Sequence, residues 1–593
     1  MGRGPQYVYA LMGTILTHDK ILLRVIRCLG AAIGVAWLAV GCVSAPADMD
    51  VTEPEHSAPL AVPPNIPLTA ELLYDILLGE IADQRGYGDV AVEALSRAAM
   101  ASKDPRLLSR AGRRAARAGD YDKALEIAQL WEQAQPGHPA PAQLSGQAFL
   151  AMGRIEEAYE KFAELIRHVE PEVGGAYRRI ADLLARSSKT DGLLALMDRL
   201  IALHPESAEA YYSKAFLADR LKQVTVIGAS IDQALMLRPD WEDAALGKFG
   251  HLADSSSPED ADAFADEYLH DHPDAPRLRA RYARFLVDRE TPRDALIQFK
   301  YLADHDSENA DAAFAVGLLS IQINELRQAR DYLLRNLALN EDNDQARLYL
   351  GQVALELEDY DGAETWYREI RQFEYAFEAQ MLLATVFAKR GDLEGAIAHL
   401  QTIEPVDDEQ KLQLYLGQER VYRETKRLND AKMVLDSALV ELPDHPELLY
   451  ARGLVAAQLN MLELHESDLR KLIARDPENA HAYNALGYTL ADQTSRYEEA
   501  LDLVGKALEL KPDDPFIMDS MGWVQYRLGN TASAIDYLER ALHSRPDAEI
   551  AAHLGEVLWV TGNQRRAKSV WKEALKNSPD NDVLLGTIRK LQQ

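Results

Sequence analysis

The sequence predicts an all-α protein, a superhelical solenoid of about fifteen helix–turn–helix repeats with a C-terminal capping helix. Prolines that close apolar helical stretches recur every 33 to 35 residues, in two runs that share one register. Alanines recur with the same period, and a period of this length is typical of repeat architectures. The prolines are Pro136, Pro171, Pro205, Pro239, Pro273, Pro443, Pro477, Pro512, Pro546 and Pro579. The alanines are Ala91, Ala124, Ala158, Ala261, Ala295, Ala329, Ala363, Ala396, Ala431, Ala500, Ala534 and Ala567.

The predicted solenoid covers residues 68–579, and its last repeat gives the physical reason for each recurring residue. Gly555 and Ala567 are small where two antiparallel helices press together. Gly562 lies in the turn, where glycine adopts a left-handed backbone at little cost. Trp571 fills the space between neighbouring helices, and Pro579 cannot continue a helix. One such helix pair cannot bury its apolar face alone, so we expect neighbouring pairs to stack.

This pattern resembles the tetratricopeptide repeat family, and the resemblance extends over residues 68–579. It implies a superhelix whose concave groove, lined by the first helix of each repeat, binds extended or folded protein partners. An irregular helical protein is the alternative, but fifteen repeats in one register argue against it.

Residues 1–41 have the form of a secretory leader. A basic flank over residues 20–27 precedes an uncharged apolar stretch that is too short for a comfortable membrane span. Small residues then lead to Cys42, and this ending resembles the lipobox of bacterial lipoproteins. The resemblance implies that Cys42 is acylated. A leader without lipidation, ending beside a chance cysteine, is the alternative.

The residue after Cys42 bears on the membrane that holds the anchor. Val43 stands where an aspartate would favour the inner membrane of Gram-negative bacteria, so the resemblance implies the outer membrane and its periplasmic face. Several acyl chains give stable anchoring where one would not. Translation starting at Met1 or at Met12 gives the same mature chain.

Two short segments flank the predicted solenoid. Residues 42–67 carry the acylated cysteine and then a proline-rich stretch with no helical period, which predicts a stiff tether of roughly 3.1 Å per residue. Residues 580–593 predict a polar capping helix, because the end repeats of solenoids need a cover.

Composition excludes several classes of function. The formal net charge is −30, whereas nucleic-acid binding needs a concentrated basic surface. Both cysteines, Cys28 and Cys42, precede the predicted solenoid, which excludes a disulfide framework, a cysteine-ligated zinc and a thiol nucleophile there. We find no phosphate-binding glycine loop, zinc-protease motif or nucleophile elbow. The sequence therefore predicts a protein that is not an enzyme, with no catalytic residue, no metal and no cofactor, and with protein partners in place of a small-molecule substrate.

Two sets of residues are candidates for partner binding. The first set combines aromatic and polar groups that the repeat register places on the concave groove, as binding surfaces commonly do. Its members are Asn484, Tyr488, Asp519, Trp523 and Tyr526. Core packing is the alternative role, above all for Trp523.

The second set is a basic docking face on one helix of the second repeat. Its arginines recur at i, i+4, i+7 and i+11, which aligns them along one helix face that could meet an acidic partner or anionic lipid. They are Arg106, Arg110, Arg113 and Arg117. A solvated face balanced by neighbouring helices is the alternative.

The C-terminal segments 519–529 and 549–559 look like those of a proteobacterial outer-membrane lipoprotein family with the same architecture. Its best-understood members are adaptors of the LbcA type, which serve a periplasmic carboxyl-terminal processing protease. The resemblance implies an adaptor that binds a PDZ-containing serine protease and its substrates, the cell-wall hydrolases. A structural scaffold for secretin, pilus or exopolysaccharide export is the alternative, and an enzyme with a site in the groove is a third reading that no motif supports.

Overall fold

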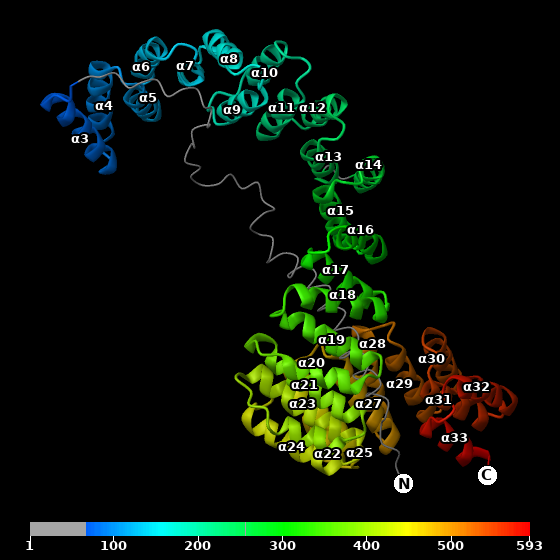
Figure 1. The fold of residues 1–593 in the computed structure, drawn as a ribbon. Coiled ribbons are helices and arrows are strands. Elements are labelled where there is room, and N and C mark those ends of the chain that lie inside the picture. The colour runs from blue at the N-terminus through cyan, green and yellow to red at the C-terminus, as the bar shows by residue number, and fades with distance from the viewer. Residues whose placement is uncertain (1–66, 255–256, 593) are drawn as a thin grey trace. The chain divides into compact units, whose positions relative to one another are not determined.

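The computed structural model describes residues 67–254 and 257–592, and in these residues all regular secondary structure is helical. It contains 31 helices and no strand within these ranges, and thirty of them form fifteen consecutive antiparallel pairs (Figure 1). The predicted fold class, an all-α solenoid of about fifteen repeats with a final helix, is confirmed. The predicted leader, Cys42 and nearly all of the tether lie outside the described residues.

The helices are numbered from α3 and follow one another with short connections. The first fourteen are α3 (Ala70–Gln84), α4 (Gly88–Ser102), α5 (Pro105–Ala118), α6 (Tyr121–Ala134), α7 (Pro139–Met152), α8 (Ile155–His168), α9 (Gly174–Ala185), α10 (Leu193–Ile201), α11 (Ala208–Arg220), α12 (Val224–Leu237), α13 (Glu242–Asp254), α14 (Pro258–Asp271), α15 (Pro276–Asp288) and α16 (Pro292–His305).

The remaining helices complete the array. They are α17 (Ala310–Gln322), α18 (Leu326–Leu339), α19 (Asp344–Glu356), α20 (Tyr360–Glu369), α21 (Phe373–Lys389), α22 (Leu393–Leu400), α23 (Asp408–Glu424), α24 (Leu428–Glu441), α25 (Pro446–Gln458), α26 (Leu462–Arg475), α27 (Ala480–Gln493), α28 (Tyr497–Leu510), α29 (Pro515–Arg527), α30 (Thr531–Ser544), α31 (Ala548–Val560), α32 (Gln564–Asn577) and α33 (Asp582–Gln592). Repeat 1 is the pair α3 and α4, and repeat 15 is the pair α31 and α32.

The residues of the repeat pattern occupy the places that their chemistry requires. Nine of the ten recurring prolines lie in the connections between one repeat and the next, and Pro579 lies between repeat 15 and α33. All twelve recurring alanines are fully buried. Gly529 and Gly562 have φ angles of 87° and 91°, the left-handed geometry expected of the turn inside a repeat. Small residues and helix-ending prolines at a fixed spacing thus produce the pairing of helices.

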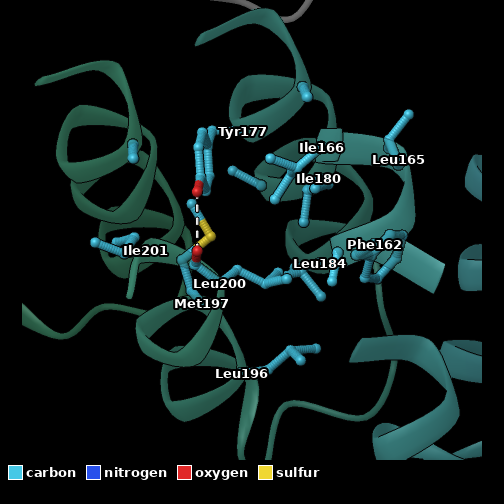
Figure 2. Packing of buried hydrophobic residues seen from close by; sticks show 14 of the residues in the cluster. Phe162, Leu165, Ile166, Tyr177, Ile180, Leu184, Leu196, Met197, Leu200 and Ile201 are labelled. Carbon is cyan, nitrogen blue, oxygen red and sulfur yellow. Dashed lines mark hydrogen bonds between the residues drawn. The ribbon is translucent and has the colours of Figure 1, made fainter. Parts of the chain in front are cut away.

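The chain divides after Leu302 into two compact units. In the unit that ends at Leu302, one core is formed by α7 to α11 (Figure 2). Phe162 of α8 and Tyr177 and Ile180 of α9 are fully buried in it. The hydroxyl of Tyr177 donates a hydrogen bond of 2.8 Å to the backbone oxygen of Leu200, which satisfies a polar group that packing would otherwise leave unpaired.

In the unit that begins at Ala303, the last core is formed around α31 and α32. The indole of Trp571 on α32 is buried and stacks on Trp559 of α31, with ring centroids 5.5 Å apart. The final helix α33 packs against α31 and α32 and buries Leu584 in the same core. The polar helix expected over residues 580–593 therefore covers the apolar edge of repeat 15.

Candidate functional site

The candidate site lies on the first helices of repeats 13 to 15, which are α27, α29 and α31. Each helix begins at a capping side chain: Asn479 accepts from the amide of Ala482, Asp514 from that of Phe516, and Asp547 from that of Glu549. Successive first helices contact one another, α27 with α29 and α29 with α31. Side chains from three repeats therefore meet on one face.

A histidine and a carboxylate form the centre of this site. The Nδ1 atom of His553 on α31 lies 3.0 Å and 3.1 Å from the two carboxylate oxygens of Asp519 on α29. Asp519 is fully buried and His553 is nearly so. An ionised carboxylate can only accept a hydrogen bond, so Nδ1 of His553 is the donor to Asp519. The other ring nitrogen is Nε2. Nε2 lies 3.4 Å from the hydroxyl oxygen of Tyr488 on α27.

Aromatic rings enclose the imidazole. The indole of Trp523 stacks on the His553 ring at a centroid distance of 4.4 Å and an interplanar angle of 20°. The ring of Tyr488 lies 5.9 Å from His553, and Tyr526 lies 5.3 Å from Trp523. Trp523 and Tyr488 are buried, whereas Tyr526 is half-buried. Of these aromatic rings, Tyr526 is therefore the one best placed to touch a partner.

Carboxylates dominate the electrostatics of this face. Burial alone would lower the pKa of His553, but the charge of Asp519, its hydrogen bond and the charges of Glu556 and Asp492 outweigh burial and raise that pKa. Burial, together with the charges of Asp547 and Asp519, raises the pKa of Glu549 to about 7.

Burial likewise raises the pKa of Asp492. Glu556 of α31 accepts a hydrogen bond of 3.1 Å from Lys590 of α33.

Four of the five predicted groove residues come together in this cluster. Tyr488, Asp519 and Trp523 contact His553, and Tyr526 contacts Trp523. Asn484 lies one turn before Tyr488 on α27, as Asp519 lies one turn before Trp523 on α29, but its buried Oδ1 atom has no hydrogen-bond partner among the described residues. The role of these residues in partner binding stays a prediction.

Sequence reasoning missed His553 as a member of the site. The signal was present, because His553 follows Asp519 by 34 residues, which is one repeat. Residues one repeat apart on first helices lie side by side in a stacked solenoid, so a histidine at that separation from a buried aspartate is a candidate partner for it.

The basic docking face lies on α5 of the other unit and is partly neutralised. Arg106 pairs with Asp104 at 2.6 Å, and Arg110 pairs with Glu80 of α3. Arg113 and Arg117 are exposed and form no ion pair with the residues that the structure describes. Two of the four guanidinium groups thus remain available for an anionic partner.

Two further properties of the described residues concern metals and membranes. Within residues 67–254 and 257–592, no three histidine, cysteine, aspartate or glutamate side chains are grouped so that they could hold a metal ion. None of the helices in these ranges combines the length and the apolar character that a membrane span requires.

The comparisons with known proteins identify the class. The family model described as tetratricopeptide repeat matches residues 320–376, 466–515 and 520–585. Over 531 residues the chain is 34% identical to "TPR repeat-containing protein PA4667" of Pseudomonas aeruginosa, covering 88% of this chain and 88% of that protein. The chain therefore belongs to the tetratricopeptide repeat proteins, whose arrays serve as scaffolds for interactions between proteins.

Two further similarities are partial. The chain is 28% identical over 151 residues to "Type IV pilus assembly protein PilF" of Pseudomonas aeruginosa, covering 25% of this chain and 58% of that protein. A solved tetratricopeptide repeat protein from Parabacteroides merdae matches with a TM-score of 0.35 and 17% identity, over 42% of this chain and 99% of its own.

Proposed function

We propose that this protein is a non-enzymatic adaptor of controlled proteolysis in the periplasm, anchored to the outer membrane through acylated Cys42. It binds a carboxyl-terminal processing protease and the cell-wall hydrolases that the protease degrades. The anchor belongs to the proposal because the lipobox-like ending at Cys42 motivates it. The partner class rests on the resemblance of segments 519–529 and 549–559 to adaptor lipoproteins.

The observation that carries the proposal is the face shared by α27, α29 and α31. It combines a half-buried tyrosine, Tyr526, with carboxylates, and it is held in place by the buried pair of His553 and Asp519. Tyrosine is one of the residues in which protein-binding hot spots are enriched. A chain of fifteen repeats also offers room for two proteins at once.

Colocalisation is the mechanism that such an adaptor uses. When the protease and its substrate bind one array, the second binding event becomes intramolecular and takes place at an effective concentration in the millimolar range for short connections. The rate of degradation then rises although the adaptor supplies no catalytic group.

The test is a degradation assay with purified components. The chain from residue 43 onward, which keeps every described residue, is mixed with the processing protease and a cell-wall hydrolase of the source organism. We expect no hydrolysis by the chain alone and a rise of tenfold or more in the rate of hydrolase degradation. An unchanged rate would remove the adaptor proposal.

A matched pair of variants locates the face. Tyr526→Ala removes the half-buried ring on α29, and Tyr537→Ala removes a half-buried tyrosine on the second helix α30 of the same repeat. Both rings pack against the core of repeats 12 to 14, so we expect the two variants to lose similar amounts of stability. We expect only Tyr526→Ala to reduce the acceleration.

A scaffold for envelope assembly is the second candidate function, because part of the chain is similar to a protein named for type IV pilus assembly. Affinity capture from detergent-solubilised envelope separates the two. Recovery of the protease with a hydrolase supports the adaptor. Recovery of secretin, pilus or polysaccharide-export components without the protease supports the scaffold.

A further inference from the structure

A cavity of about 800 Å³ lies in repeats 4 to 6, in the unit that ends at Leu302. Its walls come from α9, α11, the connections before these two helices and the residue that precedes α13. A volume of 300 to 1,000 Å³ is roughly that of sites that bind small ligands or a few side chains of a partner.

One wall of the cavity is aromatic and fixed. Tyr212 of α11 and Trp241 lie with ring centroids 4.8 Å apart at an angle of 58°. The guanidinium of Arg238 lies 3.8 Å from the centroid of Trp241 and also donates to Glu209 at 2.7 Å. Because Gly247 has no side chain, the Tyr212 ring can lie close to α13, where a Cβ atom at residue 247 would come within 3.2 Å of it.

Two arginines of α9 also line the cavity. Arg178 is exposed at the rim and Arg179 is half-buried, and neither forms a hydrogen bond or an ion pair with any residue that the structure describes. Burial lowers the pKa of Arg179, and no neighbouring carboxylate offsets this effect. Leaving a half-buried cation unpaired costs free energy, so binding of an anion beside Arg179 would be favourable.

Most of the carboxylates around the cavity are already engaged. Glu209 pairs with Arg238, and Glu170 lies 3.2 Å from His204. Glu206 lies 3.6 Å from the other nitrogen of His204, and Glu172 is exposed. Arg179 is half-buried and has no counter-ion among the described residues, so an external carboxylate could pair with it and with Arg178 beside it.

We propose that this cavity binds a protein segment in which a carboxylate stands next to an apolar side chain. Arg178 and Arg179 hold the carboxylate, because a guanidinium can donate two parallel hydrogen bonds to it. Tyr212 and Trp241 receive the apolar side chain. The proposal does not depend on the proposed protease partner, and its test contains no protease.

The test measures the binding of fluorescein-labelled peptides to the chain from residue 43 onward by fluorescence anisotropy. The first probe is an end-blocked hexapeptide with two aspartates flanking a phenylalanine, and the second has asparagines in their place. A third, with asparagines, ends in phenylalanine with a free terminal carboxylate. We expect the first probe to bind at least tenfold more tightly than the second, with an affinity that falls as salt rises.

Variants assign the binding to the cavity. The double variant Arg178→Gln with Arg179→Gln should weaken binding of the first probe at least tenfold, and Trp241→Leu should weaken it severalfold. Arg167→Gln, an exposed arginine on the second helix α8, should leave it unchanged. Arg179→Leu should also raise the melting temperature of the free protein, because it removes an unpaired, half-buried charge.

The outcomes separate the two sources of carboxylate. Tighter binding of the first probe assigns the site to an internal acidic segment, and tighter binding of the third assigns it to a chain end. Equal binding of all three probes, no binding, or full affinity in the double variant would overturn the proposal.

Discussion

The imidazole of His553 and the carboxylate of Asp519 form a buried pair that joins two neighbouring repeats. Their closest atoms, Nδ1 and a carboxylate oxygen, are 3.0 Å apart although 34 residues of chain separate them. A charged pair in a buried position is stable only when both partners are present, since each one alone would remain desolvated. The pair therefore fixes how α31 packs on α29.

Replacing Asp519 tests this coupling. Asp519→Asn keeps the shape but removes the charge, so we expect the pKa of His553 to fall, because burial then dominates. The local free energy of unfolding of α29 and α31 should drop by about 3 kcal/mol. Nuclear magnetic resonance titration measures the pKa, and amide hydrogen exchange measures the local stability.

The control is Glu573→Gln, which disrupts the exposed pair of Glu573 and Lys576 on α32. It should cost less than about 1 kcal/mol. Equal losses in Glu573→Gln and Asp519→Asn would show that burial of the pair has no consequence.

The stability of the last repeats should fall as the pH rises from about 5 to 8. Glu549 has a pKa of about 7 in the folded chain and 4.5 ordinarily, so the folded state holds a proton that the unfolded state has lost between these values. His553 acts in the same direction, because its pKa is raised above its ordinary value of 6.5 and its stabilisation is lost as the pH rises through the folded value.

Glu549→Gln removes the contribution of Glu549 to this pH dependence. The variant should gain about 3 kcal/mol at pH 8 relative to the unaltered chain, because the pKa shift from 4.5 to about 7 corresponds to that free energy, and it should show little gain at pH 4. Hydrogen exchange in α31 as a function of denaturant, corrected for the intrinsic exchange rate at each pH, measures the stability at pH 8 and at pH 4. A variant that loses stability at pH 8 would contradict the assigned burial of Glu549.

The helix pairing could be predicted from sequence because it depends on features that each repeat contains. The recurring alanine positions show this. Three positions of that register hold other residues: Leu193 and His465 are fully buried, and Ile227 is half-buried. His465 fits because its Nδ1 lies 2.8 Å from the backbone oxygen of Gly453, so burial leaves that nitrogen with a partner.

The candidate site could be predicted only in part, because its contacts join different repeats. The register placed Asp519 and Trp523 on first helices, but the pattern of one repeat does not state which side chain of the next repeat fills the space between them. His553 fills it, and this buries Trp523. The unpaired Arg179 was missed for the same reason, since only packing shows that no carboxylate reaches it.

Arg452 should be essential to the packing of repeats 11 and 12. Its guanidinium donates to both carboxylate oxygens of Asp468 at 2.7 Å and 2.8 Å and to Asp436 at 2.8 Å. Asp468 is fully buried, so Arg452→Met leaves its charge without a cation. We expect a loss of about 3 kcal/mol in the local stability of α25 and α26, measured by hydrogen exchange.

A surface arginine provides the comparison. Arg540 lies 3.6 Å from Asp536 on α30, and both side chains are more than half exposed. Arg540→Met should cost less than about 1 kcal/mol. If Arg452→Met cost as little, Asp468 would have to be solvated in the folded chain.

Two glycines inside helices should respond to alanine with opposite signs. A Cβ atom at Gly555 of α31 would collide with the indole of Trp571, whose ring is buried and cannot move away. A Cβ atom at Gly505 of α28 would meet no atom within 4 Å. Gly555→Ala should therefore destabilise repeat 15 by about 1–3 kcal/mol or more through overpacking.

Gly505→Ala should stabilise its repeat by about 0.5–1 kcal/mol, because alanine loses less conformational entropy in a helix. Thermal unfolding and hydrogen exchange in the affected helices give both signs. The double variant Gly555→Ala with Trp571→Leu should cost less than the sum of the two single changes, since the smaller side chain removes the collision. Additive costs would mean that Gly555 is required for a reason other than the close approach of Trp571.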